Sequence, residues 1–139
     1  MTEPRGLDHQ TALVYVMVLA AAADGDMSEQ EMVIIGDMVD KLPVFTGFDR
    51  SRLGSVAESC VERLNGESAL DDLLILITEA LPERLRETAY ALACEVVACD
   101  NSAGQQELRF LEMLRHETNV DRLTSAAIER GIAALNRTL

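Results

Sequence analysis

Four acidic residues occupy matching places in two copies of a short turn. Asp24 follows an apolar segment and Glu31 lies seven residues later, and Asp100 and Glu107 repeat that spacing further along the chain. If the two turns meet, four carboxylates repel one another unless a cation neutralises them. An all-oxygen set suits a hard ion such as Ca²⁺, Mg²⁺ or Mn²⁺, whereas zinc is poorly served. The sequence therefore predicts a divalent-metal site formed by these four residues.

The surroundings of the two turns also match. Residues 21–35, AAADGDMSEQEMVII, align with residues 97–111, VACDNSAGQQELRFL, with four identical positions. Four identities are little above chance for such a window, so their placement carries more weight. In both copies an acid directly follows an apolar helix, and a second acid lies in the first turn of the next helix. This placement predicts an internal repeat of a helix-turn-helix unit.

Helix capping offers a different reason for the same acids. Glu31 lies three residues after Ser28, which is the spacing of a capping box. Glu107 holds the equivalent place after Gly104, and a carboxylate there also suits the positive end of the helix dipole. The two aspartates can likewise bond backbone N–H groups of their own turns. The sequence leaves both the structural and the metal-binding interpretations open.

The elements that carry these turns are helical. Apolar residues recur at helical spacing, and sustained strand-like alternation is absent. Breaks fall at Pro43, at Asn65-Gly66 and before Pro82, and no segment is long enough to link separate domains. We therefore predict an all-α fold, a compact bundle of about seven helices in a single domain over residues 1–139, with two pseudo-repeated helix-turn-helix units. The expected helices cover about 8–23, 28–42, 49–65, 68–80, 82–99, 104–116 and 120–134.

The apolar pattern also predicts which faces turn inward. The first helix is apolar nearly all round in its second half, so we expect it at the centre of the core. The apolar side chains of loop 43–48 are expected to tuck inward. In the sixth helix the expected inward residues are Leu108, Leu111 and Leu114.

Composition indicates a packed chain outside the membrane. Of 139 residues, 48% are apolar and only three are proline, which excludes a disordered or collagen-like chain. The longest apolar run, Ala12 to Ala23, is well short of the roughly 20 residues that span a bilayer. The first ten residues, MTEPRGLDHQ, lack a secretory signal. We therefore expect a cytoplasmic protein without a transmembrane segment, whose three cysteines are core thiols rather than a disulfide or redox pair.

The net charge of −12 constrains the partners. Such a charge repels phosphate backbones and anionic membranes, so nucleic acid is not expected as a partner. Within the first 42 residues eight acids stand against only Arg5 and Lys41. This end of the chain is therefore a place for cations or a basic partner, although much of the charge can be a solvated face.

Catalytic motifs are absent. The sequence contains no Gly-rich phosphate loop, G-x-S-x-G elbow or H-E-x-x-H motif, and neither His9 nor His116 has a second His or Cys at ligand spacing. Paired acids can serve a metal-dependent hydrolase, but a chain with two Tyr and no Trp has few platforms for sugars. We therefore expect no enzymatic activity.

Taken together, the repeated motif resembles the tellurite-resistance TerB family, and the resemblance covers nearly the whole chain. It is carried by Ala23-Asp24-Gly25 with Glu31, and by Cys99-Asp100-Asn101 with Glu107, each followed by an apolar continuation. The first copy fits the family pattern better. In the second, asparagine replaces the usual glycine, which keeps a residue that tolerates the left-handed conformation but loses the freedom of glycine.

The resemblance implies a compact helical fold, a divalent-metal site built from the matching acids, and a nonenzymatic role in bacterial stress or tellurite resistance. Related domains occur at the N-terminal side of a membrane-anchored DnaJ-type co-chaperone, whereas this sequence shows neither an anchor nor a J-domain. We therefore expect a metal-binding or metal-sensing adaptor in which the ion pins the two turns together. The alternative is a protein-interaction scaffold that needs no metal. The sequence specifies neither the protein partner nor the oligomeric state.

Overall fold

The computed structural model describes residues 7–23, 25, 27–99 and 104–139. Within these residues the predicted all-α fold is confirmed: seven α-helices and two short 3-10 turns pack together, with no strand. The helices are α1 (His9–Ala22), α2 (Glu29–Lys41), α3 (Leu53–Glu62), α4 (Ala69–Ala80), α5 (Glu83–Ala98), α6 (Gln105–Thr118) and α7 (Arg122–Leu135), and the 3-10 turns are η1 (Pro43–Phe45) and η2 (Arg50–Arg52).

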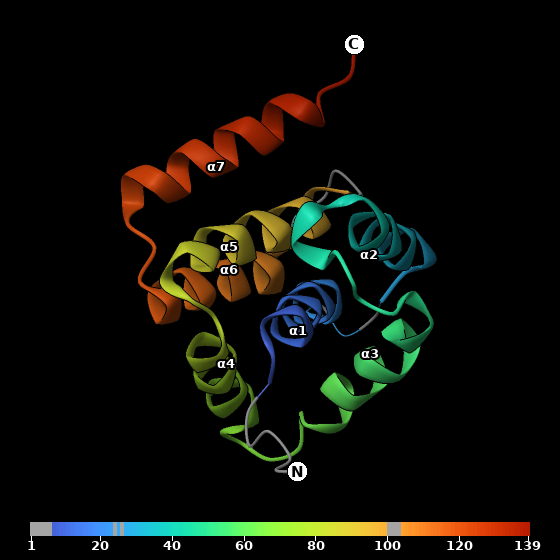
Figure 1. The fold of residues 1–139 in the computed structure, drawn as a ribbon. Coiled ribbons are helices and arrows are strands. Elements are labelled where there is room, and N and C mark those ends of the chain that lie inside the picture. Colours follow the sequence, from blue (N-terminus) through green and yellow to red (C-terminus); the bar gives the residue numbers. More distant parts are fainter. Residues whose placement is uncertain (1–6, 24, 26, 100–103) are drawn as a thin grey trace.

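Helix α1 occupies the centre of the bundle, as predicted. Every residue from Ala12 to Ala21 is buried, and α2 to α6 all contact this helix (Figure 1). Asp8 caps its start by accepting a 2.7 Å hydrogen bond from the Thr11 N–H. Tyr15 ties α1 to α3, because its hydroxyl lies 2.8 Å from Ser59 Oγ. A helix apolar on all sides can be stable only when neighbours cover all of it, and here they do.

Loop 43–48 folds inward in part. Phe45 is buried, while Val44 and Phe48 are half-buried against the core. The rings of Phe45 and Phe48 meet edge to face with centroids 6.0 Å apart, a favourable arrangement for aromatic quadrupoles. Asp49 then caps η2 by accepting a hydrogen bond from the Ser51 N–H.

The orientation of α6 differs from the prediction. Leu111 and Leu114 are buried as expected, but Leu108 is 52% exposed and the prediction for it was wrong. Phe110 takes the inner position instead, since the helix is rotated so that residues 107, 110, 111 and 114 face the core. The helix also continues two residues beyond the expected end, to Thr118, and stops at Asn119, which adopts the left-handed conformation with φ 58°.

Helix α7 lies across the outside of the bundle and packs mainly on α5 (Figure 1). Its half-buried residues Ile128 and Ile132 pack against the core, while Leu123 is 83% exposed. Two polar contacts join the C-terminal segment to α5. The Tyr90 hydroxyl donates to Glu129 Oε2 at 2.5 Å, and Asn136 Nδ2, just past the end of α7, donates to Glu95 Oε1 at 3.1 Å.

Two of the cysteines are core thiols. Cys60 and Cys94 are buried and form no disulfide, as expected, and Cys99 is half-buried. Burial raises the pKa of both the Cys60 and the Cys94 thiol to about 12. No helix in the described part of the chain combines the length and apolar character needed to cross a membrane.

Candidate metal centre at the repeated acidic turn

The helix boundaries repeat in register. Helix α1 ends at Ala22 and α5 ends at Ala98, a separation of 76 residues. Helix α2 begins at Glu29 and α6 begins at Gln105, again 76 residues apart. The predicted repeat is therefore a repeat of structure as well as of sequence, with the same number of residues between the two helices in each copy.

In the first copy Glu31 completes a full capping box. Its side-chain Oε1 accepts a 2.8 Å hydrogen bond from the Ser28 N–H, and its own N–H donates to Ser28 Oγ at 3.1 Å. The predicted capping role of Glu31 is therefore confirmed. The residue is only 2% exposed. Such burial is unusual for an acidic side chain, which is almost never fully buried unless it is paired.

The second copy contains half of the same arrangement. Glu107 Oε1 accepts a 2.9 Å hydrogen bond from the Gly104 N–H, and Glu107 is also 2% exposed. Gly104 has no hydroxyl, so this N-cap residue does not supply the side-chain acceptor that Ser28 supplies in the first copy. The carboxylate is thus the part of the arrangement that both copies share.

Burial of these two carboxylates requires compensation. Removing an ionised carboxylate from water costs several kcal/mol unless hydrogen bonds or opposite charge offset the loss. The N-cap N–H and the positive end of the helix dipole both contribute to that compensation in each copy. A carboxylate has two oxygens, so capping through one of them is compatible with ligation of a cation by the same group.

The first helix of each copy shares a hollow or groove with the second helix of the other copy. A hollow of about 260 Å³ is lined by Ala22 and Ala23 at the end of α1 together with Gln106 in the first turn of α6. On the other side, Ile34 of α2 and Glu95 of α5 line a common groove. The start of α6 therefore borders the same hollow as the end of α1, and residues 34–42 of α2 border the same groove as residues 88–95 of α5.

The two aspartates of the predicted site, Asp24 and Asp100, lie outside the described residues. Among the residues that are described, no three carboxylate, imidazole or thiol groups gather where they can hold a metal ion. Because only two of the four predicted ligands belong to that part, the four-acid site stays a prediction. Both histidines, His9 and His116, are exposed.

No protein-family model, curated protein or solved structure matches this chain. The resemblance to the TerB family thus rests on the repeated motif alone, and the metal ligands are inferred from the residues of this chain.

One feature that the sequence did not predict is an apolar groove between α2, α5 and α7 with a volume of about 540 Å³. Ile34, Met38 and Leu42 of α2 line it and follow one another at intervals of four residues, in addition to the core-facing residues Ile35 and Val39. The signal was available, because a helix with apolar residues on two adjoining rows has more apolar surface than one core contact covers.

Substitution at the N-caps is expected to shift stability in opposite directions in the two copies. Ser28→Ala removes the acceptor for the Glu31 N–H and is expected to lower the free energy of unfolding by about 1 kcal/mol. Gly104→Ser adds a hydroxyl at the N-cap, and the added Cβ meets Glu107 Oε1 at an ordinary 3.7 Å. This variant is therefore expected to raise the free energy of unfolding by roughly 0.3 kcal/mol. Urea unfolding followed by circular dichroism measures both. Equal losses in the two variants would contradict the half-box description.

Proposed function

We propose that this chain is a nonenzymatic, TerB-like adaptor that binds a divalent cation at its two acidic turns. The observation that carries the proposal is the pair of buried carboxylates, Glu31 and Glu107, at equivalent places of a structural repeat. Capping explains why a carboxylate is favourable at a helix start, but a capping residue has no need to be buried. A bound cation accounts both for the carboxylate at the helix start and for its burial.

The predicted partners of these two residues support the same chemistry. Asp24 and Asp100 each precede the glutamate of their copy by seven residues, and the start of α6 borders the same hollow as the end of α1. With oxygen ligands, the ion expected is Ca²⁺, Mg²⁺ or Mn²⁺. A bound ion joins the two turns and so sets the shape of the surface that α2, α5 and α6 present to a partner. A role in bacterial stress or tellurite resistance follows from the resemblance alone.

Cation binding is expected to raise the melting temperature. A ligand that binds only the folded chain adds about 2.7 kcal/mol at a free concentration 100 times its dissociation constant. For a chain of this length that corresponds to a rise of roughly 8 °C. The measurement is calorimetric melting of chelator-stripped protein, repeated with calcium, magnesium or manganese chloride at constant ionic strength. No shift with any of the three ions would refute the metal site.

Four variants separate ligation from capping. Glu31→Gln retains an oxygen that accepts the Ser28 N–H but loses the charge, so it is expected to melt normally without cation and to lose most of the cation shift. Asp24→Asn and Asp100→Asn are expected to lose the shift as well. Ser28→Ala is the matched control, because it weakens the cap and lowers the melting temperature while the cation shift persists. A shift retained in both aspartate variants would move the ion elsewhere on this acidic surface.

The second candidate function is an interaction scaffold that needs no metal. The apolar groove between α2, α5 and α7 favours it, because such a surface gains free energy when a partner covers it. The two functions differ in their requirement for the ion. A scaffold binds its partner equally well in chelator and in cation, whereas a metal-pinned adaptor binds more tightly when the ion is present.

A further inference from the structure

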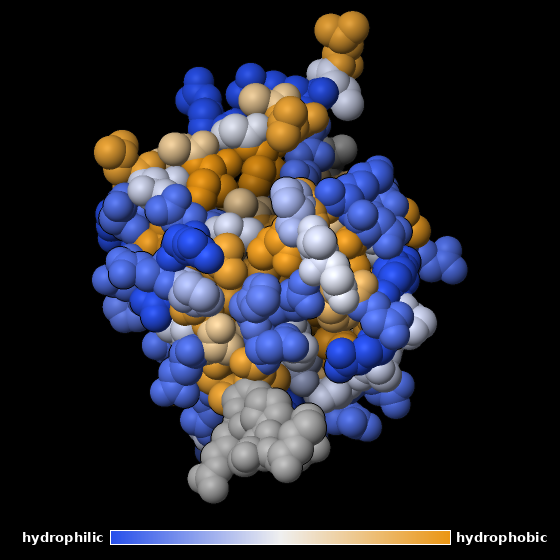
Figure 2. Space-filling model, in the orientation of Figure 1, coloured by the Kyte–Doolittle hydropathy of each residue, from blue (hydrophilic) through white to orange (hydrophobic). Residues whose placement is uncertain are grey.

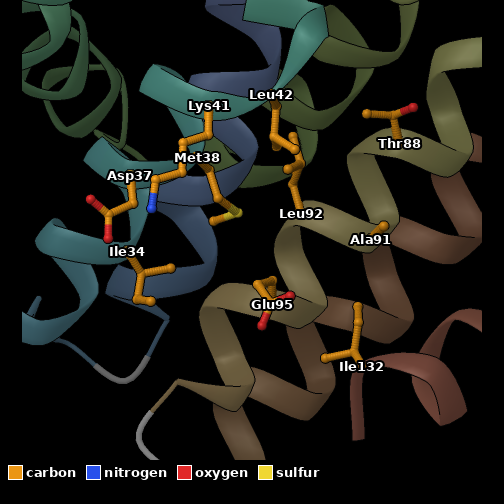
Figure 3. A pocket seen from close by; sticks show the side chains of 10 residues that line it. All are labelled: Ile34, Asp37, Met38, Lys41, Leu42, Thr88, Ala91, Leu92, Glu95 and Ile132. Atoms are coloured by element: carbon orange, nitrogen blue, oxygen red, sulfur yellow. The ribbon is translucent and has the colours of Figure 1, made fainter. Parts of the chain in front are cut away.

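The groove between α2, α5 and α7 is mainly apolar, with one acidic residue on its α2 wall and one on its α5 wall. In Figure 3 Met38 and Leu42 of α2 point toward Leu92 of α5, and Ile132 of α7 bounds the other side. Its lining consists of Ile34, Asp37, Met38, Lys41, Leu42, Thr88, Ala91, Leu92, Glu95 and Ile132. Apolar side chains also gather along α7 and in the hollow beneath it in Figure 2. The chain thus leaves a row of apolar side chains open beside α7.

The length of the groove fits two turns of a helix. Its α2 wall runs from Ile34 to Leu42, a rise of eight residues or about 12 Å along a helix axis. An amphipathic helix that presents apolar residues at positions i, i+4 and i+7 covers about 10.5 Å with those anchors. The groove therefore accommodates three successive anchors from one helix.

Charge distinguishes the occupants that suit this groove. Asp37 on α2 and Glu95 on α5 flank the apolar floor, and Lys41 is the single basic residue in the lining. The first 121 residues carry 23 acidic against nine basic side chains. Cationic side chains on an incoming helix are therefore attracted to the walls as well as to the whole surface.

The chain itself supplies an example of such a helix. Residues 122–139, which contain α7, carry three arginines and one glutamate. This segment lies on α5 with Ile128 and Ile132 toward the core and forms one wall of the groove. Helix α7 thus shows that α5 packs against an amphipathic helix, here through Ile128, Ile132 and the hydrogen bond from Tyr90 to Glu129.

We propose that the groove between α2, α5 and α7 binds an amphipathic helix of a partner protein that carries Lys or Arg beside its apolar row. The incoming helix lies next to α7, with its apolar row on Met38, Leu42 and Leu92 and its cations toward Asp37 and Glu95. This inference names the partner surface of the proposed adaptor and rests on that role, but it does not depend on the cation. A second copy is a poorer occupant, since two chains of charge −12 repel each other.

The experiment uses two synthetic peptides of about 18 residues, long enough for five helical turns. Both have leucine on one face, and one has lysine at all other positions where the second has glutamate. Fluorescence anisotropy with the full chain is measured in EDTA and again in calcium chloride. The lysine peptide is expected to bind at least about tenfold more tightly than the glutamate peptide, and to weaken as salt rises from low to physiological concentration. Equal binding of the two peptides would overturn the proposal.

Three variants locate the binding. Ala91→Arg projects a long cationic side chain into the groove and is expected to weaken the lysine peptide by about tenfold, in line with loss of a buried interface position. Asp37→Lys reverses one wall and lies on the exposed surface, so it tests the charge without disturbing the core. Ala126→Arg, on the exposed side of α7, is the matched control and is expected to bind as the parent chain does. Loss of binding in the control but not in the groove variants would place the site elsewhere.

The remaining outcomes assign failure to one proposal or the other. A dimer in light scattering that Ala91→Arg dissociates would show that a second copy occupies the groove, and the partner-helix proposal would be wrong. Absence of peptide binding together with an intact cation-dependent melting shift would reject the groove and leave the metal site. Peptide binding in EDTA without any cation shift would support the groove and reject the metal site.

Discussion

Raising the pH from about 8 to about 10 is expected to lower the free energy of unfolding by about 4 kcal/mol, because two buried thiols resist ionisation in the folded chain. Burial raises the pKa of Cys60 and of Cys94 to about 12, and Glu129 adds to the effect at Cys94. The unfolded chain releases these protons from about pH 8.5, its ordinary thiol range. The folded state therefore holds more protons between these values, and its stability falls as the pH rises.

Below the unfolded thiol pKa this contribution is fully present, so stability is expected to be flat with respect to these two groups at neutral pH. Guanidinium unfolding in the presence of a reductant, at half-unit steps of pH, measures the decline. The double variant Cys60→Ala, Cys94→Ala is expected to lose most of the pH dependence even though it is less stable at pH 8. An unchanged slope in that variant would show that other groups cause the decline. Burial and the hydrogen bond to Glu129 also raise the pKa of Tyr90, but its effect begins only near pH 10.

Shortening Leu13 to alanine is expected to destabilise the chain by about 3–5 kcal/mol, the range for a fully buried leucine whose neighbours cannot close the cavity. Leu13 is 0% exposed and lies in the helix that five others surround. Since domains have only about 5–15 kcal/mol in total, this single change can remove much of the stability. Urea unfolding followed by circular dichroism gives the difference.

The matched control is Leu123→Ala, which removes the same atoms from a side chain that is 83% exposed on α7. It is expected to change the free energy of unfolding by less than about 0.5 kcal/mol. A large loss in this control would mean that Leu123 is covered in solution, as it would be if α7 formed an interface. A small loss in Leu13→Ala would contradict the central position of α1.

Local signals in the sequence were enough to predict most helices and their boundaries. Ser28 with Glu31 predicted the capping box that begins α2, and Pro43 predicted its end, because both signals act on the backbone within a few residues. The burial of α1 was also predictable, since a helix with apolar residues on every side has no face to offer to water. The repeat was readable for the same reason: both copies carry the same short-range signals 76 residues apart.

Only the tertiary structure decided which surfaces meet. In α6 the apolar residues Leu108, Phe110 and Leu111 allow more than one inner face, and packing against α1, α4 and α5 selected the one that leaves Leu108 exposed. The burial of Glu31 and Glu107 follows equally from their neighbours, since a charged side chain by itself predicts exposure.

The sequence by itself thus determined the helices, their caps and the acids of the repeated turn, because these depend on interactions between residues close along the chain. Packing decided that two of those acids are buried and that α7 leaves an open groove beside α5. These outcomes depend on the fit between surfaces distant in sequence, for which periodicity within one helix carries no information.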